Sequence, residues 1–177
     1  MSPAFLEERT LAALHVLTRG KSMLHKLVIG ALGAMAVMFL GTAFAQGTAT
    51  EAKAMLDKAA VAVKADKAMT LDTINKGEGG FLDRDLYVFC FNIGDGKAVA
   101  NGSTNPAAKK TMGVDVRTLK DATGKVFGQG LYDGAKEGQI TEVSYMFPRP
   151  GADKTPVPKV SFVTKAGDLG CGVGYYK

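Results

Sequence analysis

The chain has 177 residues, enough for one ordinary domain, and a formal net charge of +5 from 22 basic and 17 acidic side chains. Its lysines are spread along the sequence, whereas nucleic-acid-binding proteins cluster basic residues into a patch, so we expect no nucleic-acid partner. The chain has only two cysteines, two histidines and no tryptophan.

The first notable segment is residues 27–45, which contain no charged side chain and follow Lys21 and Lys26. A basic region, an apolar region and an end with small residues at alternate positions are typical of a secretory signal peptide. An apolar stretch of 19 residues is also nearly long enough to span a bilayer, so an uncleaved membrane anchor is the competing interpretation.

We predict cleavage between Ala45 and Gln46, so that residues 1–45 form a leader. Because the stretch before the apolar region is long for a leader, Met23 is an alternative start. Residues 46–177 would then be a single exported domain with a net charge of +3, located in the periplasm or secreted.

The predicted exported domain contains no histidine, because His15 and His25 both lie in the predicted leader. Serine or cysteine nucleophiles activated by histidine are therefore excluded, as are histidine-ligated metal sites. The cysteines form no CxxC pair, and the sequence has no glycine-rich phosphate-binding loop. We therefore predict a protein that is not an enzyme, with no catalytic residue, no metal site and no cofactor.

Two helices are predicted at the start of the domain. Over residues 51–65, apolar side chains recur at three- and four-residue intervals, which indicates an amphipathic helix, capped by Thr50. The apolar stripe consists of Ala52, Met55, Leu56, Ala59, Ala60 and Val63. A second helix is predicted over residues 69–75, and Gly77 ends it.

Five strands are predicted after these helices. Residues 85–93 are apolar on both faces and rich in aromatic and β-branched side chains, which is typical of a buried central strand. Residues 102–124 are predicted to be irregular and residues 126–136 to be helical. The other predicted strands cover residues 97–101, 139–147, 157–165 and 169–176.

Runs of strands joined by short turns indicate an antiparallel sheet in an α+β fold. We expect the long helix on one face of this sheet. Residues 102–136, which we call the excursion, are expected on the other face, with a pocket between the excursion and the sheet.

The last predicted strand has glycine at alternate positions, Gly170, Gly172 and Gly174, so one of its faces carries almost no side chains. Glycine inside a strand often marks the close approach of a ligand or of another backbone. Two interpretations are open: a helix packs tightly on this face, or the face forms a ligand slot.

The two cysteines, Cys90 and Cys171, lie in the middle of the first and last predicted strands, on apolar faces. Two cysteines in an exported chain suggest one disulfide, which would bridge these strands if they are neighbours. The alternative is a pair of buried free thiols that pack as small apolar side chains.

Lys159 lies in an otherwise apolar strand. Facing a pocket, its ammonium group would pair with a ligand carboxylate; facing solvent, it would be an ordinary surface lysine. Tyr87, Tyr132 and Tyr145 could donate hydrogen bonds to the same ligand, or serve only as core side chains. Asn101 is either a polar contact to the ligand or a turn residue.

Five segments of the chain resemble the single Cache domain, an extracytoplasmic sensor module of bacterial chemoreceptors and kinases. The resemblance covers nearly all of residues 51–177 and implies a PAS-like, five-stranded antiparallel sheet behind a long N-terminal helix. The segments are Asp85-Leu-Tyr-Val-Phe, Asp121-Ala-Thr-Gly-Lys125, Tyr145-Met-Phe-Pro-Arg-Pro-Gly151, Val157-Pro-Lys-Val-Ser161 and Gly172-Val-Gly-Tyr-Tyr-Lys177.

The resemblance also implies a small organic ligand, often a short carboxylate such as acetate, propionate or pyruvate, held between the sheet and the excursion. Related domains often have His-Pro or His-Gly where this chain has Asn101-Gly102, a difference that bears on the identity of the ligand. The positions that correspond to the ligand site are Tyr87, Phe89, Asn101, Tyr145 and Lys159.

Three functions are compatible with these features. The first is a ligand-binding module that signals through a partner such as a membrane-bound sensor kinase or chemoreceptor, since no output domain follows Lys177. The second is a structural or interaction protein of the cell envelope, with its pocket filled by side chains. The third is an enzyme that uses Lys159 together with an aspartate or glutamate.

Overall fold

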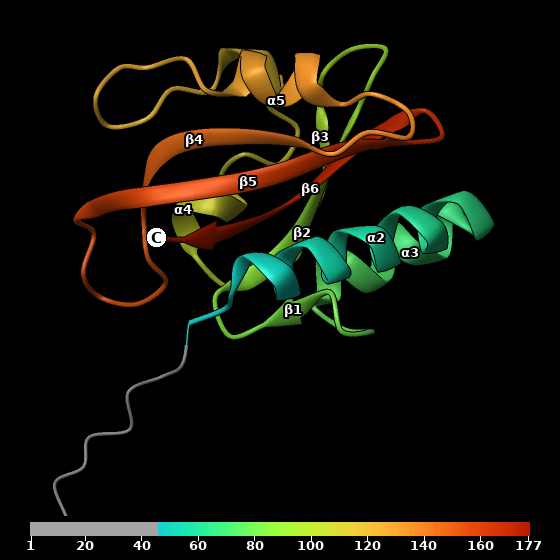
Figure 1. Cartoon of the computed structure of the whole chain (residues 1–177), viewed down its shortest axis with the longest axis horizontal. Coiled ribbons are helices and arrows are strands. Elements are labelled where there is room, and N and C mark those ends of the chain that lie inside the picture. Colours follow the sequence, from blue (N-terminus) through green and yellow to red (C-terminus); the bar gives the residue numbers. More distant parts are fainter. Residues whose placement is uncertain (1–45) are drawn as a thin grey trace, which may run out of the picture. The chain divides into compact units, whose positions relative to one another are not determined.

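The computed structural model describes residues 46–177 of the chain (Figure 1). The predicted leader, the alternative start at Met23 and the Ala45 side of the predicted cleavage position lie outside the described residues. Within the described part of the chain, no helix is both long enough and apolar enough to cross a bilayer.

The helices and strands follow one another in nearly the expected order. The elements are α2 (Ala49–Ala65), α3 (Lys67–Lys76), β1 (Leu82–Asp83), β2 (Leu86–Asn92), β3 (Ala98–Asn101), α4 (Pro106–Lys109), η2 (Val116–Thr118), α5 (Gly128–Gly134), β4 (Thr141–Pro148), β5 (Pro156–Ala166) and β6 (Leu169–Tyr176). The five predicted strands correspond to β2–β6, and the predicted helices to α2, α3 and α5. The sequence pattern does not reveal β1, α4 or η2, because each is too short to repeat an apolar spacing.

Helix α2 is capped by Thr48, the residue before its first turn, so the predicted cap at Thr50 is wrong. The Thr48 hydroxyl accepts a hydrogen bond from the backbone N–H of Glu51 at 3.2 Å, and the Glu51 carboxylate accepts one from the Thr48 N–H at 2.8 Å. This reciprocal pair satisfies N–H groups that the first turn of a helix leaves free. Helix α3 ends at Gly77 as predicted, with a left-handed φ of 70°.

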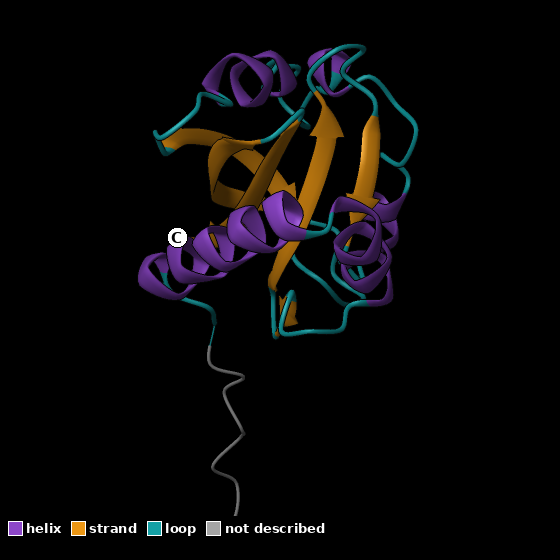
Figure 2. Cartoon of the chain, turned by 90° about the vertical axis from the view of Figure 1, so that its right-hand side faces the viewer, coloured by secondary structure: helices purple, strands orange, loops and turns teal. Residues whose placement is uncertain are grey.

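The sheet is antiparallel, with its strands in the order β3-β2-β6-β5-β4 and with β1 pairing to the start of β2. The last strand, β6, therefore lies in the middle of the sheet. Helix α2 crosses one face, and α3 packs beside it against β3 (Figure 2). The excursion covers the opposite face, where α5 packs on β4, β5 and β6 (Figure 1). This is the α+β arrangement expected from the sequence.

Two clusters of buried side chains hold these layers together. The first lies between the sheet and the helices α2 and α3, and includes Leu56, Val88 and Phe162. The second lies between the sheet and the excursion, and includes Phe91 and Leu131. Burying a side chain of this size contributes about 1.5–3 kcal/mol. Helices α2 and α3 therefore cover one face of the sheet, and the excursion covers the other face, where the site lies.

Cys90 of β2 and Cys171 of β6 stand opposite each other in the sheet register and are joined by a disulfide. Both side chains are fully buried on the face that α2 covers. Of the two alternatives open at the level of sequence, the structure contains the bridge between neighbouring strands.

Candidate functional site

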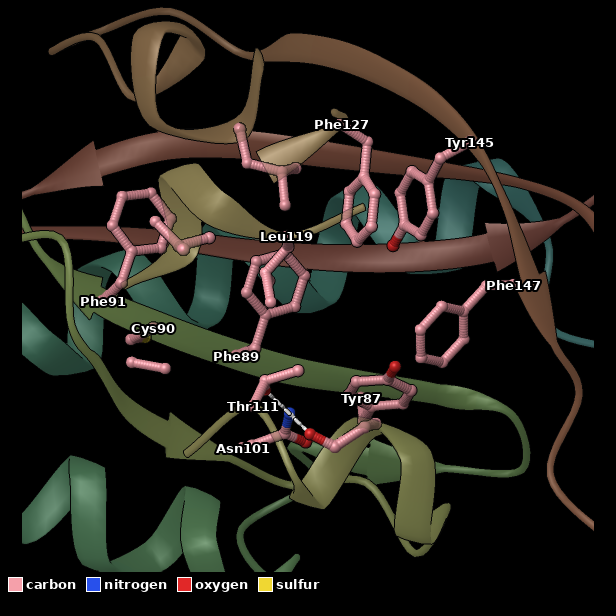
Figure 3. A pocket seen from close by; sticks show the side chains of 14 residues that line it. Tyr87, Phe89, Cys90, Phe91, Asn101, Thr111, Leu119, Phe127, Tyr145 and Phe147 are labelled. Atoms are coloured by element: carbon pink, nitrogen blue, oxygen red, sulfur yellow. Dashed lines mark hydrogen bonds between the residues drawn. The ribbon is translucent and has the colours of Figure 1, made fainter. Parts of the chain in front are cut away.

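A cavity lies between the sheet and the excursion, where the order of elements predicts a pocket (Figure 3). Its volume is about 40 Å³. A single water molecule needs about 10–15 Å³ on the same measure, so the cavity has room for a molecule of a few heavy atoms. Its walls are formed by Tyr87, Phe89, Cys90, Phe91, Ala98, Asn101, Ala108, Thr111, Val116, Leu119, Phe127, Leu131, Tyr145 and Phe147.

Strands β2 and β4 supply most of the aromatic wall of this cavity. Tyr87, Phe89 and Phe91 alternate along β2 and therefore share one face of it, as Tyr145 and Phe147 do on β4. The sequence analysis includes Tyr87, Phe89 and Tyr145 in the site but misses Phe91 and Phe147. The same alternation is the signal that could have found both of them.

The excursion contributes a sixth aromatic side chain, Phe127. Its ring stacks on Tyr145, with centroids 4.0 Å apart and planes 8° from parallel. Phe147 then meets Tyr145 edge-on at 6.0 Å. The helix predicted over residues 126–136 would include Phe127, whereas α5 begins only at Gly128 and Phe127 immediately precedes it. Its part in the site follows only from the way the excursion folds back over β4.

Two tyrosine hydroxyl groups point into the cavity region. In Figure 3 the hydroxyls of Tyr87 and Tyr145 approach the same space from opposite walls. The Tyr145 hydroxyl is 2.8 Å from Oγ of Ser161, and both groups are buried. Burial raises the pKa of Tyr87 and of Tyr145, so both phenols stay protonated at neutral pH and can donate hydrogen bonds.

Lys159 is only 1 % exposed, so the interpretation of this residue as a surface lysine is wrong. It stands in β5 between Tyr145 on one neighbouring strand and Tyr176 on the other. Its Nζ donates to the Tyr87 hydroxyl at 3.1 Å and lies 4.3, 4.6 and 5.4 Å from the ring centroids of Tyr87, Tyr176 and Phe147. The ammonium group therefore sits in a cage of aromatic rings directly behind the cavity wall.

No ion pair within residues 46–177 includes Lys159. Burial lowers its pKa, because an ammonium group without a carboxylate partner is costly to remove from water. Of the five expected site residues, Lys159 is the one that does not line the cavity itself. It reaches the cavity through Tyr87, whose hydroxyl stands between them.

Asn101 lines the cavity, but both hydrogens of its side-chain amide and one acceptor position of its oxygen are bonded within the protein. Its Nδ2 donates to the Ala108 carbonyl at 3.0 Å and to Oγ1 of Thr111 at 3.3 Å, and its Oδ1 accepts from the Ser103 N–H at 3.0 Å. Asn101 thus anchors the start of the excursion. Tyr132 does not line the cavity, because its hydroxyl donates to the Ile93 carbonyl instead.

The excursion is held on β4 by two residues that the sequence analysis does not assign to the site. Asn105 Nδ2 donates to the Pro148 carbonyl at 3.0 Å. Asp121 accepts hydrogen bonds from the Met146 N–H at 3.0 Å and from the backbone and side chain of Thr123. These bonds, first of all that from the Thr123 hydroxyl, lower the pKa of Asp121 to about 2. Together they fix the roof of the cavity.

The glycine face of β6 is covered by side chains of the adjacent strands, so neither a helix nor a ligand explains most of it. A Cβ atom on Gly170, Gly172 or Gly174 would come within 3.0 Å of the side chain of Phe91, Phe89 or Lys159, respectively. Only Gly170 also meets the end of α5, at Ala135. The glycines therefore make room for the aromatic wall and for the buried lysine.

Comparisons with known proteins bear on the whole described domain. A family model, single Cache domain 2, matches residues 18–176. A methyl-accepting chemotaxis protein from Vibrio parahaemolyticus RIMD 2210633 has a similar structure, with a TM-score of 0.55 and 19% identity over 72% of this chain and 86% of that one. No curated protein matches the chain.

Two further solved structures resemble the chain. A periplasmic sensor domain of a chemotaxis protein has a TM-score of 0.51 and 22% identity, covering 70% of this chain and 86% of its own. A Cache chemosensory domain, described for carboxylic acid recognition, has a TM-score of 0.48 and 21% identity, covering 90% and 95%. At these identities, the likeness to the first two structures supports the α+β fold.

Proposed function

Because the chain belongs to the single Cache domain 2 family, we propose that it is an extracytoplasmic sensing domain that binds a small organic carboxylate between its sheet and its excursion. The observation that carries this proposal is the buried ammonium group of Lys159, which has no carboxylate partner among residues 46–177. A buried charge is costly unless it is paired, and an anionic ligand would supply the pair.

The hydroxyl groups give a carboxylate its hydrogen-bond donors. Tyr87 accepts a hydrogen bond from Lys159 and can therefore turn its own proton toward the cavity. A carboxylate oxygen bound there would have the ammonium charge one hydrogen bond away. Tyr145, on the opposite wall, is the second donor. Phe89 and Asn101 act differently, the first as an apolar wall and the second as an anchor of the roof.

The size and charge of the cavity favour a short monocarboxylate. None of the residues that line it is charged, so a second carboxylate or an ammonium group on the ligand would be buried without a partner. A volume of about 40 Å³ suits two or three carbon atoms, as in acetate, propionate or pyruvate. We do not expect dicarboxylates or amino acids to bind.

We propose that the leader is cleaved between Ala45 and Gln46 and that the domain acts outside the cytoplasm, passing its signal to a membrane-bound sensor kinase or chemoreceptor. The basic and apolar pattern of the leader supports export. N-terminal sequencing of the exported protein tests the cleavage. A protein that keeps residues 27–45 would be membrane-anchored and would contradict this part of the proposal.

One observation favours the alternative of a structural or interaction protein. The cavity is small, and aromatic side chains already cover the glycine face of β6. If the pocket is closed in this way, no small molecule should change the stability of the protein. No observation favours the enzyme hypothesis: no aspartate or glutamate among residues 46–177 forms an ion pair with Lys159.

A thermal-shift experiment separates the two functions. Acetate, propionate and pyruvate are added in large excess, with propionamide as the uncharged control for propionate. A ligand at a hundred times its Kd stabilises the folded state by about 2.7 kcal/mol. We expect a rise in melting temperature with at least one carboxylate and none with the amide. No response to any carboxylate would reject the binding function and leave the closed-pocket alternative.

A further inference from the structure

We propose that carboxylate binding is coupled to the uptake of one proton by Lys159, so that the domain holds its ligand more tightly in acidic than in alkaline medium. This inference rests on the proposed function, since it assumes that a carboxylate occupies the cavity. The affinity of the site for its ligand would then depend on the external pH as well as on the structure of the ligand.

The geometry around Lys159 provides the coupling. The amine is 1 % exposed and, among residues 46–177, has one hydrogen-bond partner, the Tyr87 hydroxyl, which can accept a hydrogen bond from the ammonium group or donate one to the neutral amine. The rings of Tyr87, Tyr176 and Phe147 surround it without supplying a full negative charge. The site therefore accommodates both the ammonium and the neutral amine, and an anion behind Tyr87 would favour the ammonium.

The other charged and titratable groups around Lys159 do not replace the ligand. Asp85, just before β2, lies beyond ion-pair distance, and its carboxylate only partly offsets the effect of burial. Tyr87, Tyr145 and Tyr176 have their pKa values raised by burial, so they remain neutral below pH 10. The guanidinium group of Arg149 lies over the Tyr176 ring, 4.8 Å from its centroid, and adds positive charge.

The direction of the coupling follows from these charges. Burial lowers the pKa of Lys159 in the protein alone, and a bound carboxylate raises it again. Between the two pKa values the free protein carries the neutral amine and the complex carries the ammonium, so binding takes up a proton. The affinity should fall by up to tenfold per pH unit in this range and be constant below it.

The composition of the domain makes this uptake easy to assign. Residues 46–177 contain no histidine, and both cysteines are in the disulfide, so neither residue type titrates between pH 6 and 9. Short carboxylates are fully ionised over the same range, since carboxyl groups titrate near pH 4. A proton taken up on ligand binding in this pH range must therefore protonate an amino group of the protein.

Isothermal titration calorimetry provides the test, with the tightest binder among acetate, propionate and pyruvate. Titrations at each pH from 6 to 10, in buffers of different ionisation enthalpy, measure the protons taken up per ligand. We expect the number to rise toward one as the affinity falls. Binding with no proton uptake and constant affinity up to pH 10 would overturn the coupling and leave the proposed function intact. If no carboxylate binds at any pH, both fail.

Three variants and one measurement without ligand sharpen this test. Lys159→Arg stays charged throughout, so its affinity should not depend on pH, while Lys159→Met should bind weakly without proton uptake. Asp85→Asn keeps the oxygen that accepts from the Gly47 N–H but removes the charge, so the fall in affinity should begin at a lower pH.

The measurement without ligand is an NMR titration of the Lys159 side chain in the wild-type protein, which does not depend on how any variant folds. We expect its midpoint well below that of the exposed lysines. A midpoint equal to theirs would refute the proposal by itself.

Discussion

The Nζ atom of Lys159 lies 3.1 Å from the hydroxyl oxygen of Tyr87, and both side chains are buried. This contact joins β5 to β2 across β6, the strand whose glycines leave room for the lysine. A neutral hydroxyl compensates only part of the cost of burying an ammonium group. Burying the ammonium group therefore lowers the stability of the domain, and the contact with Tyr87 offsets only part of that cost.

The first prediction concerns Lys159→Met. Methionine keeps the length of the side chain and removes the buried charge, so the free energy of unfolding should rise by about 1–4 kcal/mol in chemical denaturation. The same change should abolish the thermal shift produced by a carboxylate. Lys165→Met, in the same strand at a half-buried position, is the control and should change neither quantity appreciably. A destabilised Lys159→Met protein would show that the lysine is a structural element and not a binding group.

The second prediction concerns how that stability difference depends on pH. The pKa of Lys159 is lowered in the folded state, so the unfolded chain binds more protons between the lowered value and the ordinary value near 10.5. Burying the charged Lys159 therefore lowers the free energy of unfolding by its full amount below the lowered pKa. This destabilisation disappears as the pH rises toward 10.5. The advantage of Lys159→Met over the wild type, measured in urea without ligand, should shrink on going from pH 7 to pH 10. A constant difference would contradict the lowered pKa.

The third prediction concerns the disulfide between Cys90 and Cys171. Mass spectrometry after alkylation without reductant should find neither cysteine modified in the exported protein, and two alkylated cysteines would rule the bridge out. The bond closes a loop with a sequence separation of 81 residues, so its loss should cost about 4.5 kcal/mol in the loop-entropy model. Urea unfolding of the Cys90→Ala/Cys171→Ala variant measures this cost.

The sequence predicts those elements and site residues whose positions depend on local patterns, and it misses those that depend on contacts between distant segments. Repeating apolar patterns locate α2 and strands β2–β6, because these patterns reflect which face of an element is buried. The cap at Thr48 is missed because Thr50 is an equally good cap residue two positions later. Tyr87 on β2 and Tyr145 on β4 line the cavity, since alternation puts both side chains on the inner face of the sheet.

The burial of Lys159 is harder to predict, because lysine is seldom buried and nothing local distinguishes this one. What buries it is tertiary: Gly174 on the neighbouring strand has no side chain, so the lysine stem lies across it. Asn101 shows a second kind of tertiary effect. It lines the cavity, but the excursion folds back far enough to use both of its amide donors and to place the Ser103 N–H on its carbonyl oxygen, which no local pattern predicts.

The fourth prediction concerns Asp121→Asn in the excursion. The amide would place a donor opposite either the backbone N–H of Thr123 or that of Met146, neither of which can accept, so at least one hydrogen bond to Asp121 must break. We expect faster amide hydrogen exchange in residues 119–127 with little change in the sheet. Asp133→Asn, in the same excursion but bonded only to Gln129, is the control. Equal exchange in the two variants would mean that Asp121 does not hold the roof.

Acid should have a related effect on the wild-type excursion. The pKa of Asp121 is about 2 in the folded state, below its ordinary value of 3.8, because the Thr123 hydroxyl and nearby backbone N–H groups donate to the carboxylate. The stabilisation is therefore present above pH 4 and is lost as the pH falls through about 2.

The last prediction tests why β6 needs glycine. At Gly172 a methyl group would meet the ring of Phe89 and the backbone carbonyl of Phe162, the latter at 2.9 Å. The ring can rotate away only into the cavity, and the carbonyl belongs to a paired strand. Gly172→Ala should therefore lower the free energy of unfolding by about 1–3 kcal/mol and weaken carboxylate binding. Gly94→Ala is the control, because nothing lies within 4 Å of its added methyl group. If Gly172→Ala is as stable as Gly94→Ala and binds normally, the glycine face is not shaped by the aromatic wall.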